Sequence, residues 1–115
     1  KLIQEALQAS ITPPGPMTLG QNWFGMKGVW HTASGGLHPG TIGDSIKMLG
    51  QDIIIQAGGG VLGHPWGIEA GVEAMVQARD VAMNRLDMDL WLKNNPDSAL
   101  AKAASHWGFA TKIVY

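Results

Sequence analysis

Two glycine runs are the part of this sequence whose residue types and spacing could do chemistry. Ser34-Gly35-Gly36 and Gly58-Gly59-Gly60 each follow a short apolar stretch, and the residues around the two runs match in register. Glycine lets the backbone approach a ligand closely and turn freely, so successive N–H groups can point at an anion. One run alone would also suit a plain tight turn, but two matched runs favour a pair of phosphate-type ligand loops. Neither run has the dinucleotide-binding or P-loop pattern.

Two polar side chains accompany the runs. Ser34 could offer its hydroxyl to the same anion or to a substrate oxygen, and its alternative role is that of a turn residue. Gln56 ends the second apolar stretch, where its amide either points into the site or caps backbone groups inside the sheet. From the residues alone, both roles stay open for each side chain.

His38 and His64 are the side chains that most resemble metal ligands, and each precedes a proline in the loop after a glycine run. No Asp, Glu or third His stands at ligand spacing beside them, so we expect both to fix their loops rather than to bind a metal. His31 and His106 have no partner that the sequence shows. No Ser-His-Asp set, carboxylate pair or activated lysine can be assembled, so no catalytic residue is assigned and the local signal is for binding.

The elements that must position these residues form a repeated unit of strand, loop and helix. Residues 28–33 and 52–57 are predicted as strands, and the second lacks alternation, which is typical of a strand buried on both faces. Thr41 is expected to cap a helix that Gly50 ends, and a longer helix is expected over residues 68–86. The predicted buried positions are Ile42, Ile46 and Leu49 in the first helix and Ile68, Val72, Met75, Val76, Met83 and Leu86 in the second.

Further helices are predicted at both ends of the sequence, over residues 1–9 and over residues 96–106, the latter capped by Asn95 and closed by Gly108. The alternation of elements predicts a parallel α/β fold. Two parallel strands leave faces and edges uncovered, so we expect residues 1–115 to be an incomplete domain within a larger α/β assembly. A complete (β/α)₈ barrel needs about 250 residues, and the units seen here make roughly a quarter of one.

The composition agrees with a segment that other protein surfaces cover. Hydrophobic residues make up 45% of the chain and charged residues only 15%, against a usual charged share of ~25%. The net charge of −1 carries no signal for nucleic acid or an anionic membrane surface. The absence of cysteine fits a reducing compartment, and we expect a cytoplasmic location. No apolar stretch reaches the ~18 residues of a membrane span.

The motifs resemble a known family. Residues 33–40 (ASGGLHPG) and 56–67 (QAGGGVLGHPWG) resemble the seventh and eighth strand–loop segments of the RuBisCO large subunit. The similarity continues through the following helix, and residues 103–108 (AASHWG) resemble the C-terminal helix of the archaeal-type, form III, enzymes. It covers nearly everything from about residue 28 onward and, more loosely, residues 1–27, and two long motifs at the expected separation make it specific.

The resemblance implies the C-terminal part of a (β/α)₈ barrel that binds a sugar bisphosphate, with one phosphate held by these two loops. It implies ribulose-1,5-bisphosphate carboxylase activity with competing oxygenation, a Mg²⁺ ion held with a carbamylated lysine, and a homodimer or larger homo-oligomer. The motifs for the metal ligands, the catalytic lysines and the catalytic histidines lie upstream in that family and do not occur here. The remainder of the barrel is therefore an expected partner, and this chain alone is expected to be inactive. The substrate contacts that the resemblance implies are Ser34, Gly35, Gly36, Gln56, Ala57, Gly58 and Gly59.

Two alternatives share the glycine loops. A RuBisCO-like enolase or isomerase of methionine salvage would keep them and change the upstream residues, although the Gly63–Gly67 loop favours true carboxylases. A non-catalytic interaction module would keep only the anion site. The coding sequence upstream of Lys1 distinguishes the three. A Lys-x-Asp-Glu motif and a sixth-loop lysine support the carboxylase, altered versions support the salvage enzyme, and the lack of any such partner sequence supports the interaction module.

Overall fold

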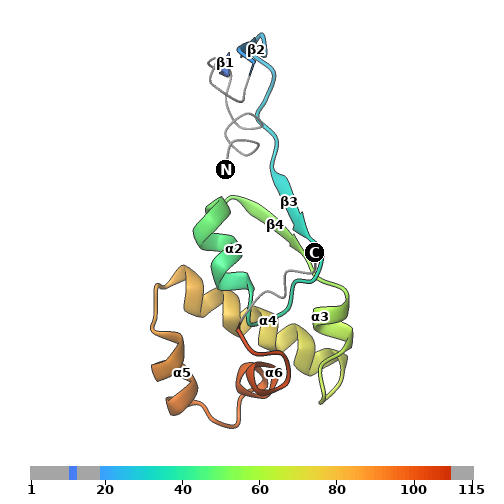
Figure 1. Ribbon diagram of the computed structural model, residues 1–115, viewed down its shortest axis with the longest axis vertical. Coiled ribbons are helices and arrows are strands. Elements are labelled where there is room, and N and C mark those ends of the chain that lie inside the picture. Colours follow the sequence, from blue (N-terminus) through green and yellow to red (C-terminus); the bar gives the residue numbers. More distant parts are fainter. Residues whose placement is uncertain (1–10, 13–18, 110–115) are drawn as a thin grey trace.

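The computed structural model describes residues 11–12 and 19–109, which form an α/β body with an extended arm (Figure 1). The helix predicted over residues 1–9 lies outside the described residues. On the arm, β1 (Ile11–Thr12) and β2 (Gln21–Asn22) form a short antiparallel pair. The arm, which comprises the described residues 11–12 and 19–30, leads into the body at the strand that begins at His31 (Figure 1).

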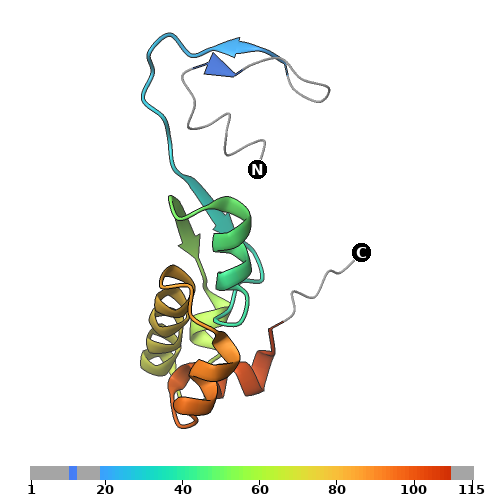
Figure 2. The same cartoon turned by 90° about the vertical axis from the view of Figure 1, so that its left-hand side faces the viewer.

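The body is built on two parallel strands, β3 (His31–Ser34) and β4 (Ile53–Gln56). They pair in register, with Ser34 opposite Gln56, so the ends of both strands meet at one edge of the sheet. Helix α2 (Ile42–Leu49) connects them and lies beside the strands (Figure 2). The two predicted strands and their parallel pairing are confirmed, although each strand is shorter than predicted.

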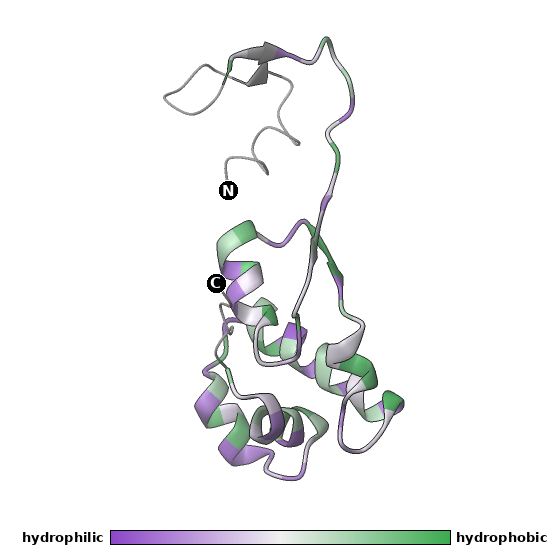
Figure 3. Cartoon of the chain, turned by 45° about the vertical axis from the view of Figure 1, so that its right-hand side comes forward, coloured by the Kyte–Doolittle hydropathy of each residue, from purple (hydrophilic) through white to green (hydrophobic). Residues whose placement is uncertain are grey.

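Only one face of this sheet is covered in the described part of the chain. The main core cluster contains Ile42, Ile46, Ala78, Val81 and Leu100. Ile53 and Ile55 pack against this cluster, whereas Ile54 between them is 50% exposed. β4 is apolar (Figure 3), and the prediction that it is buried on both faces is wrong here, because no described element lies over the second face.

Helix α2 agrees closely with its prediction. Thr41 is the N-cap residue and is 2% exposed, and Ile42 and Ile46 are buried, whereas Leu49, also predicted to be buried, is only half-buried in the last turn. The Thr41 hydroxyl does not cap the helix, because it accepts the His38 N–H at 3.1 Å and donates to the His38 carbonyl at 3.0 Å. Gly50 ends the helix with a φ of 87°, a conformation that favours glycine.

Helix α4 (Ile68–Met83) is present, but its predicted buried face is wrong. The buried positions are small residues and one valine, namely Gly71, Ala74, Ala78 and Val81. In the predicted stripe only Met75 is part-buried, and the other five side chains are 40% to 57% exposed, namely Ile68, Val72, Val76, Met83 and Leu86. The reason is close packing, since a Cβ on Gly71 would overlap the Val61 carbonyl and Ala74 packs against alanines of the last helix.

The chain after α4 contains one helix that the pattern missed and one whose cap it misplaced. α5 (Met88–Asn94) was not predicted, and Asp87 caps it by accepting the Leu90 N–H at 3.0 Å. α6 (Ala99–Trp107) begins after Ser98, which accepts the Ala101 N–H at 3.1 Å, so the predicted Asn95 cap is wrong. Gly108 closes this helix as predicted, with a φ of 75°.

Candidate functional site

The two glycine runs lie side by side because the parallel register of β3 and β4 brings both strand ends to one edge. They line a cavity of about 540 Å³, and all seven residues expected to contact substrate take part. Ser34 and Gln56 belong to the uncovered face of the sheet, at the base of the loops. The residues around the cavity are Ser34, Gly35, Gly36, Leu37, His38, Gln56, Ala57, Gly58, Gly59, Gly60 and Trp107.

The glycines of the two runs divide into open and packed positions. Gly35 and Gly36 have φ values of 94° and 66°, in the left-handed region that side chains disfavour. A Cβ on either of them, or on Gly58 or Gly59, would meet nothing within 4 Å, so the backbone there is accessible from the cavity.

Gly60 differs from the other glycines, because it is buried and a Cβ there would overlap the Leu37 carbonyl. The same Cβ would lie 2.7 Å from the His38 Cα, so Gly60 is where the second loop meets the first. The second run is also not the simple loop that was expected, because Gly58 caps the one-turn helix α3 (Gly59–Leu62). The structure thus separates the glycines whose Cα has open space around it from Gly60, which packs the two loops together.

The histidine of each loop shapes its backbone, as predicted. His64 is 4% exposed, its Nδ1 accepts the Trp66 N–H at 3.0 Å, and its Nε2 lies 2.9 Å from the Ala99 carbonyl oxygen. Because Nδ1 accepts a hydrogen bond, Nε2 carries the proton and donates to that carbonyl. His38 repeats the local bond, with its Nδ1 accepting the Gly40 N–H at 3.1 Å. The expected structural role of both histidines is confirmed.

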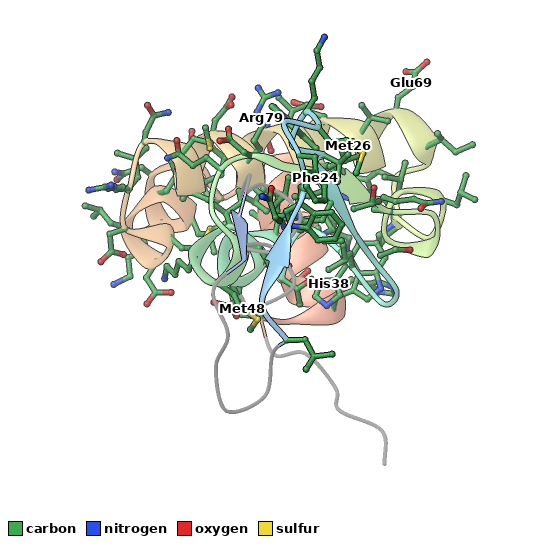
Figure 4. The ribbon with its side chains drawn as sticks, turned by 90° about the horizontal axis from the view of Figure 1, so that it is seen from above. Phe24, Met26, His38, Met48, Glu69 and Arg79 are labelled. Atoms are coloured by element: carbon green, nitrogen blue, oxygen red, sulfur yellow. The ribbon has the colours of Figure 1, made fainter. Side chains whose placement is uncertain are left out.

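His38 also has a perturbed titration. Burial lowers the pKa of the His38 imidazole from its ordinary value of 6.5, because the charged form loses solvation there. A neutral ring is also what the hydrogen bond from Gly40 requires. Figure 4 labels His38 among the side chains seen from above.

The two remaining histidines play different parts. Both ring nitrogens of His31 are buried and have no hydrogen-bond partner within the described ranges. His106 is exposed and lies edge-on to Trp107, with ring centroids 4.8 Å apart. Among the residues that the structure describes, no three His, Cys, Asp or Glu side chains come together as a potential metal centre.

Trp107 is the cavity residue that the sequence did not single out. It comes from the end of α6, far along the chain from both glycine runs, and it stacks on His38 with ring centroids 5.6 Å apart. The sequence offered no local signal for this position, because a tryptophan at a helix end is more often a core or interface anchor.

Paired strand–glycine loop–helix units with a cavity at the carboxyl ends of parallel strands define an α/β protein, and this edge is where proteins of that class commonly bind ligands. The family model described as the ribulose bisphosphate carboxylase large chain, catalytic domain, matches residues 3–107. The chain belongs to this family, and the resemblance inferred from the two motifs is confirmed.

The relatives include archaeal carboxylases. The ribulose bisphosphate carboxylase of Pyrococcus abyssi is 45% identical over 87 residues, which are 76% of this chain and 20% of that protein. The solved structure of a dimeric archaeal Rubisco from Hyperthermus butylicus matches with a TM-score of 0.83 and 40% identity, over 93% of this chain and 25% of that one. An octameric Rubisco from Pyrococcus horikoshii matches with a TM-score of 0.74 and 35% identity, over 96% and 23% of the two chains. The chain therefore spans about a fifth of the length of the curated relatives it matches.

Proposed function

We propose that residues 1–115 are the C-terminal part of a (β/α)₈ catalytic barrel and that they hold one phosphate of ribulose 1,5-bisphosphate during its carboxylation. The observation that carries the proposal is the single cavity lined by both glycine runs at the carboxyl ends of β3 and β4. Backbone N–H groups at open glycines can approach an anion without steric hindrance. The similarity to carboxylases over most of the chain supports the choice of substrate.

The role of this segment is binding and orientation. Ser34, which lines the cavity, and the open backbone of Gly35, Gly36, Gly58 and Gly59 form two halves of one anion site. A phosphate held from two sides fixes the position of the rest of the sugar, which lowers the entropic cost of bringing its reacting carbon to the catalytic groups. Those groups lie on other parts of the complete barrel in this proposal.

The proposal includes a Mg²⁺ ion in the complete enzyme. The residues described here do not fit such a centre, because no three potential ligands come together among them. Its ligands, with the carbamylated lysine, therefore belong to the remainder of the large chain, and no step of this segment involves the metal.

The same proposal covers assembly and location. The similar structures are titled dimeric and octameric, and we propose a homo-oligomer for the protein that carries this segment. Within the described part of the chain, no helix has the length and apolar character needed to cross a membrane. The lack of cysteine supports the proposed cytoplasmic location.

Gly59→Asp in the complete carboxylase tests the phosphate site. A Cβ at Gly59 meets nothing within 4 Å, so the change should not disturb the fold, but it places a carboxylate in the cavity. Like charges about 4 Å apart repel by about 4 kcal/mol at an effective dielectric of ~20, so we expect affinity for the sugar bisphosphate to fall at least ~100-fold. Titration calorimetry measures this directly.

Gly43→Asp is the matched control. Gly43 lies in the first turn of α2, away from the cavity, and a Cβ there also meets nothing within 4 Å. An acidic residue in the first turn of a helix is well tolerated, so affinity should be unchanged. If Gly59→Asp binds the bisphosphate as tightly as Gly43→Asp, the phosphate-site assignment is wrong.

A further inference from the structure

Trp107 stands where the two glycine loops meet the end of α6. Its indole stacks on the His38 ring of the first loop, with ring centroids 5.6 Å apart and planes 20° apart. It also meets the His64 ring of the second loop edge-on, at 6.2 Å and 66°. Both geometries are favourable for aromatic rings, so one side chain contacts a fixed residue from each loop.

The backbone around this indole is equally close. A Cβ on Gly63, in the second loop, would lie 3.3 Å from the Trp107 Cζ2. A Cβ on Gly40, in the first loop, would overlap the carbonyl of Gly108, the residue after Trp107. Both loops therefore pack closely against the same end of α6.

The base of this contact is anchored to the core. Leu100 is fully buried, and its N–H donates to the Gln77 Oε1 of α4 at 2.9 Å. His64 donates to the Ala99 carbonyl, so the second loop is also bonded to the start of the same helix. Hydrogen bonds hold the start of α6, and packing against α4 holds one of its faces. The position of Trp107 at the end of the helix is therefore fixed relative to the core.

We propose that Trp107 is a positioning residue that sets the separation of the two glycine loops and thereby the affinity for phosphate. The inference rests on the proposed phosphate site and adds a residue that lines the same cavity without being one of the proposed phosphate contacts. The two halves of the anion site can act together only when their separation matches one phosphate. Trp107 and the Gly60–Leu37 contact hold that separation from two sides. If the loops can move relative to each other, binding is weaker, because ordering them around the ligand costs conformational entropy.

Trp107→Leu and Trp107→Phe in the complete carboxylase test this role. Leucine removes the ring and leaves space between the loops. We expect the KM for the sugar bisphosphate to rise about tenfold and kcat to stay within about twofold of the parent value. The reason is that ground-state and transition-state binding weaken together. Phenylalanine keeps a ring to stack on His38 but does not reach as far toward Gly63, so its KM should rise only about threefold. Inhibition by inorganic phosphate should weaken in the same order.

Trp91→Leu is the matched control for a loss of stability alone. Trp91 lies on α5 and packs against the main core cluster, away from the cavity. It should lower the melting temperature while leaving the KM unchanged. If Trp107→Leu behaves in the same way, Trp107 is only a structural residue and the inference is overturned.

Two further outcomes keep the inference separate from the proposed function. If Trp107→Leu does not accumulate as folded protein, Trp107→Phe decides, and an unchanged KM in that variant overturns the inference. If Gly59→Asp abolishes binding while both Trp107 variants bind normally, only the positioning role fails. If Gly59→Asp binds normally, the phosphate site itself is wrong.

Discussion

The two histidine–proline loops shape their backbones with the same local hydrogen bond. In each, the imidazole Nδ1 accepts the N–H of the residue two positions on, which is Gly40 in the first loop and Trp66 in the second. An accepting Nδ1 must be unprotonated, so both loops need an imidazole that is neutral at this nitrogen. At the scale of single residues, each loop backbone is shaped by a histidine ring whose Nδ1 accepts a backbone N–H.

His38 therefore makes loop stability depend on pH. Its pKa is lowered by burial, so the folded state binds the proton less readily than the unfolded state, whose imidazole titrates near 6.5. The stabilisation is complete above that value and is lost as the pH falls through it toward the folded-state pKa. We expect the difference in melting temperature between the parent carboxylase and a His38→Gln variant to favour the parent most above about pH 7. This difference should decrease as the pH falls toward about 5. A difference that stays constant across this range would contradict the assignment.

At the scale of elements, β4 has two different faces although its sequence is a run of isoleucines. Ile53 and Ile55 pack against the core cluster under α2 and α4, whereas Ile54 is half exposed. Alternation is the geometry of any strand, since successive side chains point to opposite faces. The apolar residue on the uncovered face is accounted for if the remainder of a barrel lies over it, as we propose.

Ile54→Asp and Ile55→Asp distinguish the two faces. In this chain by itself, Ile55→Asp should cost about 3 kcal/mol of unfolding free energy, because it places an unpaired charge against the core cluster, whereas Ile54→Asp should cost little. In the complete carboxylase both variants should fail to accumulate as soluble protein. Thermal unfolding followed by circular dichroism and soluble yield are the measurements. A normal yield of the complete Ile54→Asp protein would show that this face stays open to solvent.

For the whole molecule, charged residues are few in the same stretch of chain whose apolar surface the structure leaves exposed. Asp44, Lys47 and Asp52 are the only charged residues between Gly28 and Gly67, the stretch that contains both strands and both loops. Large apolar side chains are exposed on the arm as well, and Figure 4 labels Phe24, which is 87% exposed, and Met26, which is 64% exposed. Apolar surface of this kind is typical of a region that packs against other protein.

The 115-residue chain purified alone should not carboxylate ribulose bisphosphate. In this proposal the chain binds one phosphate of the substrate, and the catalytic groups belong to the rest of the barrel. Fixation of labelled carbon dioxide is the measurement. Mixing the chain with the rest of the barrel should restore activity, and mixing in the Gly59→Asp version should not. Turnover by the chain alone would contradict the proposal that the catalytic groups lie on other parts of the barrel.

The sequence by itself determined the features that depend on neighbouring residues. The two strands and the ends of α2 at Thr41 and Gly50 are predictable, because strand propensity and glycine conformation are local signals. The repeated glycine motifs and the family resemblance that they carry likewise give seven of the eleven residues that line the cavity. Ser98 and Asp87 are equally local capping signals, so the start of α6 and the presence of α5 are also encoded in neighbouring residues.

Only the tertiary structure decided which surfaces meet. The pattern of α4 favoured its large apolar stripe, but the face that packs is the one with Gly71, Ala74 and Ala78, because α3 and α6 approach too closely for larger side chains. Trp107 reaches the cavity because α6 folds back beneath both loops. Contacts between residues far apart in the chain depend on how whole elements pack, and no local pattern of residue types records that choice.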